Sequence, residues 1–406
     1  MRSGPTGHRG VRRGNLALVL GEIAEGSRSR ADLAAITGLT RPAVSSLVDE
    51  LTAARLVTES GPAEPSGRAG RPGTALALDP QGPAGLGAEI GLDHLGACVV
   101  DLCGGVRARR RVGIRNRGRH PEGVLADLAE LLRQVASGEP PRPAGLTVAV
   151  PGPVGAAEGV LERSPGLGWP PRVPVAAALR VALRETGATE LAALPITVEN
   201  DANLGALAEL RLADRPTDLC HLLAGPGLGA AFLVDGRLLR GARGFAGEIA
   251  HLPVRPDGPA CPCGARGCLE QYAGETAVLG AAGLGGRGGR GRADWIEALA
   301  QRAAAGDTAV RGALATAGAA LGIAAAGVVD LVDPGAVVLG GGYGELGEWV
   351  VPAMREEMAR RITTRPWQDD WLAASPLGRH GPLLGAALHV TATVIADPGL
   401  LTDDDV

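Results

Sequence analysis

Apolar positions recur at helical spacing through the first fifty residues of the chain, and polar residues stand where helices would begin. Residues 11–24 are expected to form one helix. Ser29, with Asp32 three residues later, is typical of a capping box that opens a second helix, which Gly38 should end. Thr40 can cap a third helix, whose expected buried face carries four aliphatic residues: Val44, Leu47, Val48 and Leu51. Two helices joined by a short turn containing glycine are typical of the helix-turn-helix.

Two short alternating runs, at residues 56–58 and 74–78, follow the third helix and predict strands. The segment between them, residues 59–73, is rich in Gly, Pro and Arg, which favours a wing beside the helices. In this arrangement the third helix enters the major groove, and arginines of the wing reach phosphates or the minor groove. We therefore expect a winged DNA-binding domain at residues 10–79, with six candidate contact residues: Thr40, Arg41, Ser45, Ser46, Arg68 and Arg71. The alternative is that the same helices pack on a larger domain without touching DNA.

The run Asp-Pro-Gln-Gly-Pro at residues 79–83 interrupts regular structure and marks a boundary. Beyond it, strand-like and helix-like runs alternate as in an α/β fold, and two lobes around a cleft are expected within residues 84–395. Strands are predicted at 88–90, 97–102, 146–150, 196–198, 220–223, 230–234 and 336–339. Helices are predicted at 121–137, 173–185, 202–212, 295–305, 308–331 and 346–361.

Composition supports two or three well-packed domains in one chain. At 406 residues the chain exceeds one ordinary core, and its apolar content of 45% argues against disorder. Residues 1–72 hold ten arginines against seven acidic residues, whereas the remainder is acidic. A basic head on an acidic body suits a DNA-binding module attached to a small-molecule domain.

Neither a signal peptide nor a membrane span is expected. The first residues are polar and rich in Arg, and the uncharged run at residues 312–329 is rich in Ala and Gly, which favours a buried helix. Six cysteines in a chain of this length do not make a disulfide scaffold, and three of them cluster. We therefore expect a cytoplasmic protein with no membrane partner.

The clustered cysteines are Cys261, Cys263 and Cys268, and His251 lies ten residues before the first of them. Three thiols and an imidazole at this spacing match a tetrahedral Cys₃His zinc site. Two glycines among them, Gly264 and Gly267, would let the backbone wrap tightly around the ion. Four protein ligands leave no open position, so zinc here is expected to be structural. The alternative is a group of buried free thiols.

Asn200 and Asp201 end a predicted strand directly before a helix, which is where α/β proteins bind ligands. An amide offers donors and an acceptor, and a carboxylate can accept two hydroxyls, so the pair suits a polyol. Alternatively, Asp201 only caps the helix that follows it.

Longer motifs give the chain a family resemblance. The head sequence from Ser29 to Val57, the stretch PGPV at 151–154, SPGLGW at 164–169, and GEIAH at 247–251 with CPCGARGCLE at 261–270 resemble the ROK family of repressors and sugar kinases. The resemblance implies an N-terminal all-α/winged-helix domain, then an α/β two-lobed actin-like (ribonuclease H-like) sugar-kinase fold.

The resemblance also implies roles for individual residues. In the family's kinases the residue that matches Asp201 is the general base. His251 could bind zinc with one nitrogen and a sugar hydroxyl with the other, while Glu270 could instead be a plain surface carboxylate. Gly166 stands where the family often has Asn, which removes one contact. The implied sugar contacts are Asn200, Asp201, Glu248, His251 and Glu270.

The nucleotide loops depart from the family's pattern. Residues 89–93, Glu-Ile-Gly-Leu-Asp, match the phosphate hairpin Asp-x-Gly-Gly-Thr of the kinases. Leu92 should block the approach of backbone N–H groups to a phosphate, and Asp93 should place a negative charge there. Pro226 replaces the Thr of the second phosphate loop and removes a hydroxyl and an N–H donor. The glycines at 340–342 survive. The sequence thus predicts that the sugar-binding half is kept and that the ATP-binding half is lost.

These observations lead to the hypothesis of a transcriptional regulator, a repressor of sugar metabolism or uptake. A sugar bound between the lobes would change how a homodimer, or a tetramer, holds its winged helices on operator DNA. One alternative is an ATP-dependent sugar kinase that carries a DNA-binding head. Another is a constitutive DNA-binding protein whose zinc domain only dimerises. The pattern allows a hexose, an N-acetylated or phosphorylated hexosamine, or a pentose as the sugar.

Overall fold

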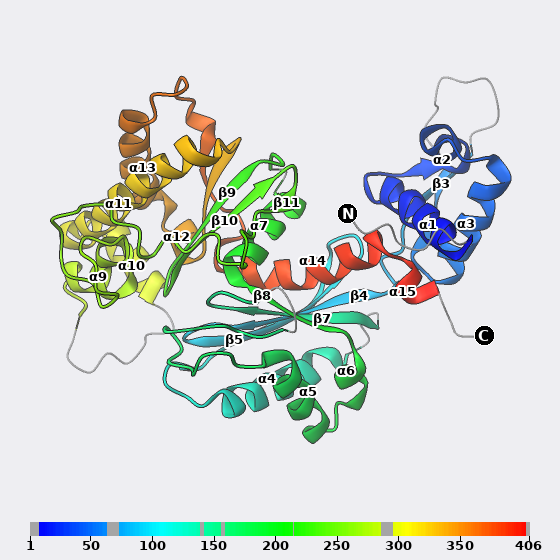
Figure 1. Ribbon diagram of the computed structural model, residues 1–406, viewed down its shortest axis with the longest axis horizontal. Helices are drawn as coiled ribbons and strands as arrows, with labels where there is room; N and C mark the ends of the chain where they lie inside the picture. Colours follow the sequence, from blue (N-terminus) through cyan, green and yellow to red (C-terminus); the bar gives the residue numbers. More distant parts are fainter. Residues whose placement is uncertain are drawn as a thin grey trace.

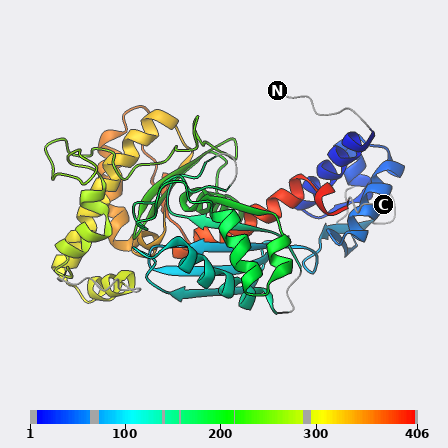
Figure 2. The same cartoon turned by 60° about the horizontal axis from the view of Figure 1, so that its bottom comes forward.

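The computed structural model describes residues 8–62, 73–138, 142–155, 159–213, 215–285 and 295–402, which form a small head and a body of two lobes (Figure 1). The head contains the N-terminal helices and stands beside the body rather than on top of it. Helix α14 (Gly381–Ala396) leads from the centre of the body to the head, as both views of the ribbon show (Figures 1 and 2).

The head follows the element order that the sequence predicts. It consists of α1 (His8–Ala24), β1 (Arg28–Ser29), α2 (Arg30–Thr37), α3 (Arg41–Ala53), β2 (Val57–Pro62) and β3 (Thr74–Leu78). The strands pair antiparallel in the order β1-β3-β2, so β2 and β3 form a hairpin beside the helices. The tip of this hairpin, with the candidate DNA contacts Arg68 and Arg71, lies outside the described residues.

The predicted caps of the second and third helices are confirmed, whereas the first helix begins at His8, three residues before its predicted start. Ser29 and Asp32 form the capping box of α2, in which the Asp32 amide donates to the Ser29 hydroxyl at 3.2 Å. Gly38 ends α2 in the left-handed conformation, with φ of 72°. The Thr40 hydroxyl accepts from the Ala43 amide and caps α3. These local signals alone fix the turn between the two helices.

The head shares its core with the body. Buried side chains of α1, α2 and α3 pack together with Leu102, Val394 and Ile395 of the body. Arg13 of α1 also forms an ion pair with Asp397, just beyond α14. Head and body therefore meet through a continuous apolar contact, not only through the connecting chain.

The first lobe is a mixed sheet in the order β6-β5-β4-β7-β8. Helices α4, α5 and α6 cover one face, and α14 covers the other (Figure 1). The elements are β4 (Ala84–Ile90), β5 (His94–Asp101), β6 (Val106–Gly113), α4 (Pro121–Ala136), β7 (Pro143–Val150), α5 (Val175–Glu185), α6 (Thr189–Ala193) and β8 (Ile196–Asn200). The sequence analysis missed β6, because this edge strand carries four arginines and buries no side chain fully.

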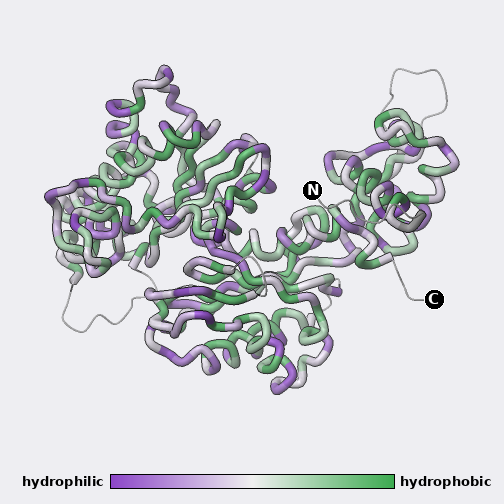
Figure 3. Tube along the Cα trace, viewed as in Figure 1, coloured by the Kyte–Doolittle hydropathy of each residue, from purple (hydrophilic) through white to green (hydrophobic). Residues whose placement is uncertain are grey.

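The second lobe is a sheet in the order β11-β10-β9-β12-β13, in which β9 and β12 are parallel. Its strands are β9 (Leu219–Ala224), β10 (Leu228–Val234), β11 (Arg237–Leu238), β12 (Ala336–Gly340) and β13 (Leu372–Ala374). Its helices are α7 (Asp201–Leu212), α8 (Glu270–Ala273), α9 (Glu275–Ala281), α10 (Trp295–Ala304), α11 (Thr308–Val332), α12 (Gly342–Glu345) and α13 (Gly347–Arg361). Hydrophobic residues follow the inner strands, and hydrophilic ones the outer turns (Figure 3).

Helix α11 is long and apolar enough to cross a membrane by length and composition alone. In the structure it packs against α13, α9 and α8 in the core of the second lobe, and 67% of its most apolar window is buried. The buried helix that the sequence predicts is therefore confirmed.

Helix α14 is the main element that the sequence analysis missed. It packs on β4 and β7 of the first lobe and on α7. Glycines allow these close contacts, since a Cβ at Gly85 would lie 2.0 Å from the Ala387 carbonyl and one at Gly385 would lie 1.9 Å from the Leu204 carbonyl. The helix is apolar on nearly every side, so it lacks the one-sided periodicity that marks a surface helix. A short helix after it, α15 (Gly399–Thr402), lies against the head (Figure 1).

Candidate functional site

Asn200 joins strand β8 to helix α7 and caps the helix. Its side-chain oxygen accepts from the amides of Ala202 and Asn203, at 2.9 and 3.2 Å, and its amide nitrogen donates to the Gly152 carbonyl at 3.0 Å. The helix cap that the sequence allows for Asp201 is therefore made by Asn200 instead. Asp201 occupies the first helical position, with one oxygen accepting from the Ala202 amide at 2.9 Å.

The buried carboxylate of Glu199 holds this turn in place, a role that sequence reasoning missed. It accepts from the Asn200 amide and from the Asn203 side chain, both at 2.8 Å, and forms an ion pair with Arg240. Glu199 precedes Asn200 on the strand, so the motif itself offered the signal. The result is a rigid strand end that presents Asp201 to the space between the lobes.

Four of the predicted sugar contacts share one electrostatic neighbourhood. Burial raises the pKa of Asp201 to about 7, and the charges of Glu89 and Glu248 act in the same direction. Burial also raises the pKa values of Glu248 and Glu270, which the nearby His251 partly offsets. The structure thus brings Asp201 together with the loop that carries the three other residues.

The predicted metal ligands also converge. One ligand atom each from His251, Cys261, Cys263 and Cys268 lies within 4.8 Å of all the others. The Nδ1 atom of His251 lies 3.6 Å from the Cys261 Sγ atom, and the Sγ atoms of Cys263 and Cys268 are 3.6 Å apart. Thiolates and an imidazole at this spacing are the donor set that zinc prefers, so the residues fit a tetrahedral ion.

The backbone of this loop needs the glycines that the sequence singles out. Gly264 and Gly267 have φ of 95° and 64°, in the left-handed region. A Cβ at Gly267 would lie 1.5 Å from the Arg255 carbonyl oxygen. Because Nδ1 of His251 faces the thiols, its Nε2 atom is the nitrogen that is left for a ligand in the cleft.

Several side chains crowd the hairpin that the sequence assigns to phosphate, around a small cavity that Asp201 also lines. The cavity there has a volume of about 80 Å³, far below the 300–1,000 Å³ of typical ligand pockets. The His94 ring lies directly over Gly91. A Cβ on that glycine would be only 1.9 Å from the imidazole, so the contact requires a glycine there. His94 Nε2 also lies 2.9 Å from the buried Glu89 carboxylate. Burial alone would raise the pKa of Glu89, but His94 and the nearby Arg111 hold it below its usual value.

Backbone amides of both loops are already in use. The Gly91 amide donates to the His94 carbonyl at 3.0 Å, and the Gly225 amide donates to the Gly227 carbonyl at 3.1 Å. Leu92 and Pro226 both line the small cavity. One backbone donor of each loop is therefore not free to bind an anion.

The expectation for Asp93 is wrong. Its side chain does not line the cavity and places no charge where phosphates would lie. It is buried against the Arg117 guanidinium instead, with Arg117 Nη2 at 3.0 Å. Residues 24 positions apart form this pair, so no local pattern could reveal it.

Two departures from the family's motifs prove to be neighbours. A Cβ at Gly166 would lie 3.1 Å from the Leu92 side chain. An Asn at position 166 would therefore press on Leu92, and the small residue accommodates the large one. The two departures from the family's motifs therefore belong to one local packing arrangement.

The predicted DNA contacts that the structure describes lie at the start of α3. Thr40, Arg41 and Ser46 are exposed and Ser45 is half-buried, while the aliphatic face of the helix is buried. The Ser46 hydroxyl accepts a long hydrogen bond of 3.4 Å from Arg12, which also pairs with Glu50. The polar end of α3 is thus available to a partner outside the chain.

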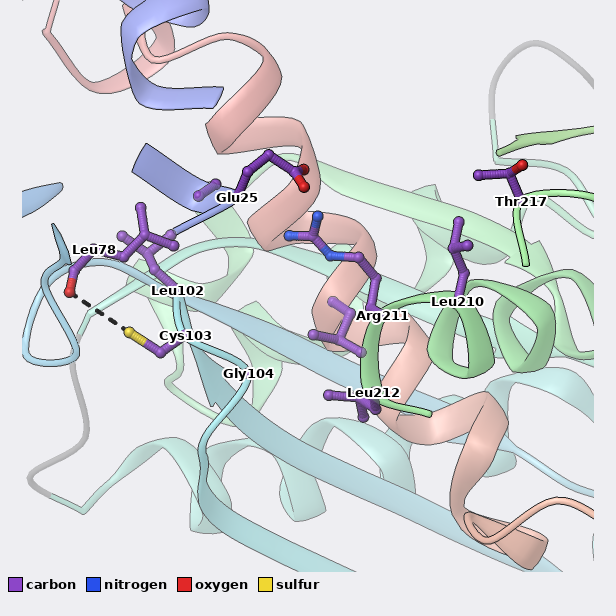
Figure 4. A pocket seen from close by; sticks show the side chains of 11 residues that line it. Glu25, Leu78, Leu102, Cys103, Gly104, Leu210, Arg211, Leu212 and Thr217 are labelled. Carbon is purple, nitrogen blue, oxygen red and sulfur yellow. Dashed lines mark hydrogen bonds between the residues drawn. The ribbon is translucent and has the colours of Figure 1, made fainter. Parts of the chain in front are cut away.

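A larger cavity, of about 450 Å³, lies where the head meets the body (Figure 4). Glu25 and Leu78 line it from the head, and Cys103 lines it from the turn after β5. Arg211 and Leu212, at the end of α7, complete the body side. Because α7 starts at Asp201, one rigid helix runs from the candidate sugar site to this junction.

Comparison with known proteins finds a matching family for the body and for the head of the chain. The ROK family profile matches residues 85–393, and the MarR family profile matches residues 17–71. The xylose repressor of Bacillus subtilis is 28% identical over 381 residues, which cover 92% of this chain and 94% of that protein.

Solved structures agree on the fold. A ROK family transcriptional regulator, a homologue of the E. coli MLC protein, covers 97% of this chain and is itself covered completely, with a TM-score of 0.76 and 24% identity. A ROK family glucokinase from Streptomyces griseus, in complex with glucose and AMPPNP, covers 75% of this chain and is itself covered to 98%, with a TM-score of 0.63 and 26% identity. The first match extends over the head and the second does not. The expected fold, a winged helix followed by a two-lobed actin-like sugar-kinase fold, is confirmed, and the chain belongs to the ROK family.

Proposed function

We propose that this protein is a transcriptional repressor whose binding to operator DNA is controlled by a sugar. The observation that carries the proposal is a contrast between two groups of residues. Asp201 lies in the same electrostatic neighbourhood as Glu248, whereas the His94 ring covers Gly91 of the hairpin that the sequence assigns to phosphate. A kinase needs both groups, whereas a sensor needs only the first. The winged helix in the same chain supplies the output.

The effector is proposed to contact Asp201, Glu248, His251 and Glu270. Carboxylates and an imidazole nitrogen can accept or donate to several hydroxyls of one pyranose ring. Asn200 is assigned mainly to hold this end of the strand, because its amide already makes three hydrogen bonds. The repressors among the relatives are named for xylose, so D-xylose is the first effector to test, with D-glucose beside it.

Zinc is proposed as the resident metal, bound by His251, Cys261, Cys263 and Cys268. The ion would supply no chemistry beyond shaping the loop, since these four ligands complete a tetrahedron. His251 would then present its second nitrogen to the sugar in a fixed orientation.

The head is proposed to place α3 in the major groove through Thr40, Arg41, Ser45 and Ser46. Arg68 and Arg71, which lie in the sequence between β2 and β3 and outside the described residues, would contact the DNA backbone or the minor groove. A homodimer, or a tetramer of two dimers, would read two half-sites of a palindrome, and the protein would act in the cytoplasm.

Two helices offer a physical route from sugar to DNA. Helix α7 runs from Asp201 to the junction cavity, and α14 runs from Pro382, beside the nucleotide-side cavity, into the core of the head. Both helices pack tightly on each other, so a change in lobe arrangement would shift the head as a unit. A sugar can drive this shift only by binding one arrangement more tightly than the other.

A second candidate function, a sugar kinase with a DNA-binding head, is favoured by one observation. Asp201 keeps the position of a general base, with a pKa of about 7 that suits proton transfer. The filled nucleotide side opposes it.

The test of the proposed function is operator binding in the presence of sugar. DNA fragments selected from a random pool by the purified protein would be labelled and titrated, with and without D-xylose or D-glucose, in a fluorescence anisotropy assay. A sugar should change the Kd for the selected fragment by roughly fivefold or more. Phosphorylation of a sugar from MgATP, with no effect of sugar on DNA binding, would favour the kinase.

A further inference from the structure

One arginine joins the two lobes through two carboxylates. Arg117, in the segment after β6 of the first lobe, pairs with Asp93 of the same lobe and with Glu275, the first residue of α9 in the second lobe. Its Nη2 atom lies 3.0 Å from Asp93 Oδ2, and its Nε atom lies 3.3 Å from both Asp93 oxygens. The same Nη2 atom also donates to the Glu275 carboxylate.

These charges are shielded from water. The side chains of Asp93 and Glu275 are 10% and 13% exposed, and that of Arg117 is 31% exposed. Burial raises the pKa of Glu275, and the charge of Asp93 acts in the same direction, whereas Arg117 opposes both. Without the guanidinium, two mostly buried carboxylates would face each other unpaired, which proteins avoid.

The backbone around Arg117 is fixed to the hairpin between β4 and β5. The Asn116 side chain donates to the carbonyls of Gly91 and His94, at 2.8 and 2.9 Å, and the Asn116 amide donates to the Leu92 carbonyl at 2.9 Å. Arg117 is therefore held at a set position above the hairpin between β4 and β5, and its hydrogen bond with Glu275 reaches the other lobe.

The far end of this contact belongs to the segment that carries the candidate sugar ligands. Glu275 lies five residues after Glu270, and the two short helices α8 and α9 pack against each other. Any movement of α9 away from Arg117 would therefore carry Glu270 away from Asp201, together with the loop of the candidate metal ligands at residues 261–268 (the metal loop). The ion pairs act across the cleft, beside the place where a sugar would lie.

We propose that Asp93, Arg117 and Glu275 form a clasp that holds the two lobes closed over the sugar site without any nucleotide. Arg117 is then a positioning residue for the effector, because its ion pair with Glu275 sets the distance between Asp201 and Glu270. The part of this inference that concerns the effector rests on the proposed function. The clasp itself rests only on the contacts between the lobes.

The clasp is tested first without a sugar, by hydrogen–deuterium exchange on the full chain. Arg117→Ala and the milder Glu275→Gln are compared with Arg133→Ala, which removes an exposed ion pair with Glu130 on α4. Amides of α9 and of the hairpin between β4 and β5 should exchange about tenfold faster in Arg117→Ala than in the wild type. The increase should be smaller in Glu275→Gln, and the control should exchange at the wild-type rate. Unchanged exchange of α9 in both clasp variants would overturn the clasp.

The link to the effector is tested by calorimetric titration of the same variants with D-xylose and D-glucose. For a sugar that the wild type binds, Arg117→Ala should weaken binding roughly tenfold, Arg117→Lys should restore part of the affinity, and the control should match the wild type. Equal affinities in Arg117→Ala and wild type would overturn the positioning role. If the wild type binds neither sugar, the proposal that D-xylose or D-glucose is the effector is contradicted. The exchange experiment alone then tests the clasp.

Discussion

Two groups of residues that resemble the family's motifs, one for sugar and one for nucleotide, are arranged differently in this chain. On the sugar side, Asp201 and the metal loop keep the residues of the family's motifs and converge in space. On the nucleotide side, the His94 ring covers Gly91 and leaves a cavity of about 80 Å³. The His94 ring therefore crowds the hairpin that resembles a phosphate loop, whereas His251 and the three cysteines come together. The difference teaches that the proposed sugar site and the proposed loss of nucleotide binding rest on separate residues and can be tested separately.

The largest expected effect comes from removing the proposed zinc ion. Cys263→Ser, or a strong chelator, should release zinc and destabilise the body by several kcal/mol, because structural zinc sites contribute ~10 kcal/mol or more in small domains. Metal content by mass spectrometry and the melting temperature are the readouts. Cys103→Ser, at the head–body junction, is the matched control and should keep its zinc. One zinc per chain in Cys263→Ser would contradict the assigned ligands.

The next effect concerns the ionisation of Asp201 and its influence on the stability of the protein without sugar. Because the folded-state pKa of Asp201 is raised to about 7, its carboxyl costs no stability below about pH 4, where it is protonated in both states. The cost grows as the pH rises towards 7 and is at most about 4 kcal/mol, at 1.36 kcal/mol per pH unit. Asp201→Asn should therefore gain stability over the wild type between pH 4 and pH 8, as measured by urea unfolding. A difference that stays constant with pH would show an ordinary carboxyl.

Removal of the same side chain should separate sugar binding from DNA binding. Asp201→Ala should weaken sugar binding on the order of 100-fold, since a carboxylate that accepts two hydroxyls contributes charge-assisted hydrogen bonds. Operator affinity without sugar should stay within a factor of two or so of the wild type. Loss of operator binding itself would mean that Asp201 supports the fold or the head rather than the effector.

In the head, two arginines should differ in kind. Arg41→Ala should cost about 1–3 kcal/mol on the selected operator and relax its sequence preference. Arg71→Ala should weaken binding to all DNA alike and reduce the slope of the salt dependence by about 1. Anisotropy titrations at several salt concentrations distinguish the two patterns. A uniform loss for both variants would remove Arg41 from the base contacts.

The smallest expected effect is on the nucleotide half. Pro226→Thr restores the hydroxyl of the family's second phosphate loop, yet it should bring no measurable ATP binding, because His94 still covers Gly91. Saturable ATP binding by this variant would show that one residue, rather than the packing of the whole half, closed the site.

Local signals carried most of what the sequence could predict. Caps and glycines predicted the helices of the head to within a few residues, and the cysteine spacing predicted a cluster that the fold brings together. Strand β6 and helix α14 were missed because neither has a one-sided apolar pattern. The partners of Asp93 and Glu89 were missed because tertiary packing sets them. Asp93 pairs with Arg117 from the segment after β6, and Glu89 pairs with His94, whose ring lies over Gly91.

The central claim is that the sugar half was kept and the nucleotide half was lost. Its most direct test is thermal melting of the purified, zinc-loaded protein against a panel of pentoses and hexoses, with and without MgATP. We predict that one sugar raises the melting temperature in a concentration-dependent way and that MgATP changes nothing, alone or with the sugar. A melting temperature that rises with MgATP would contradict the account and restore the kinase as the better interpretation.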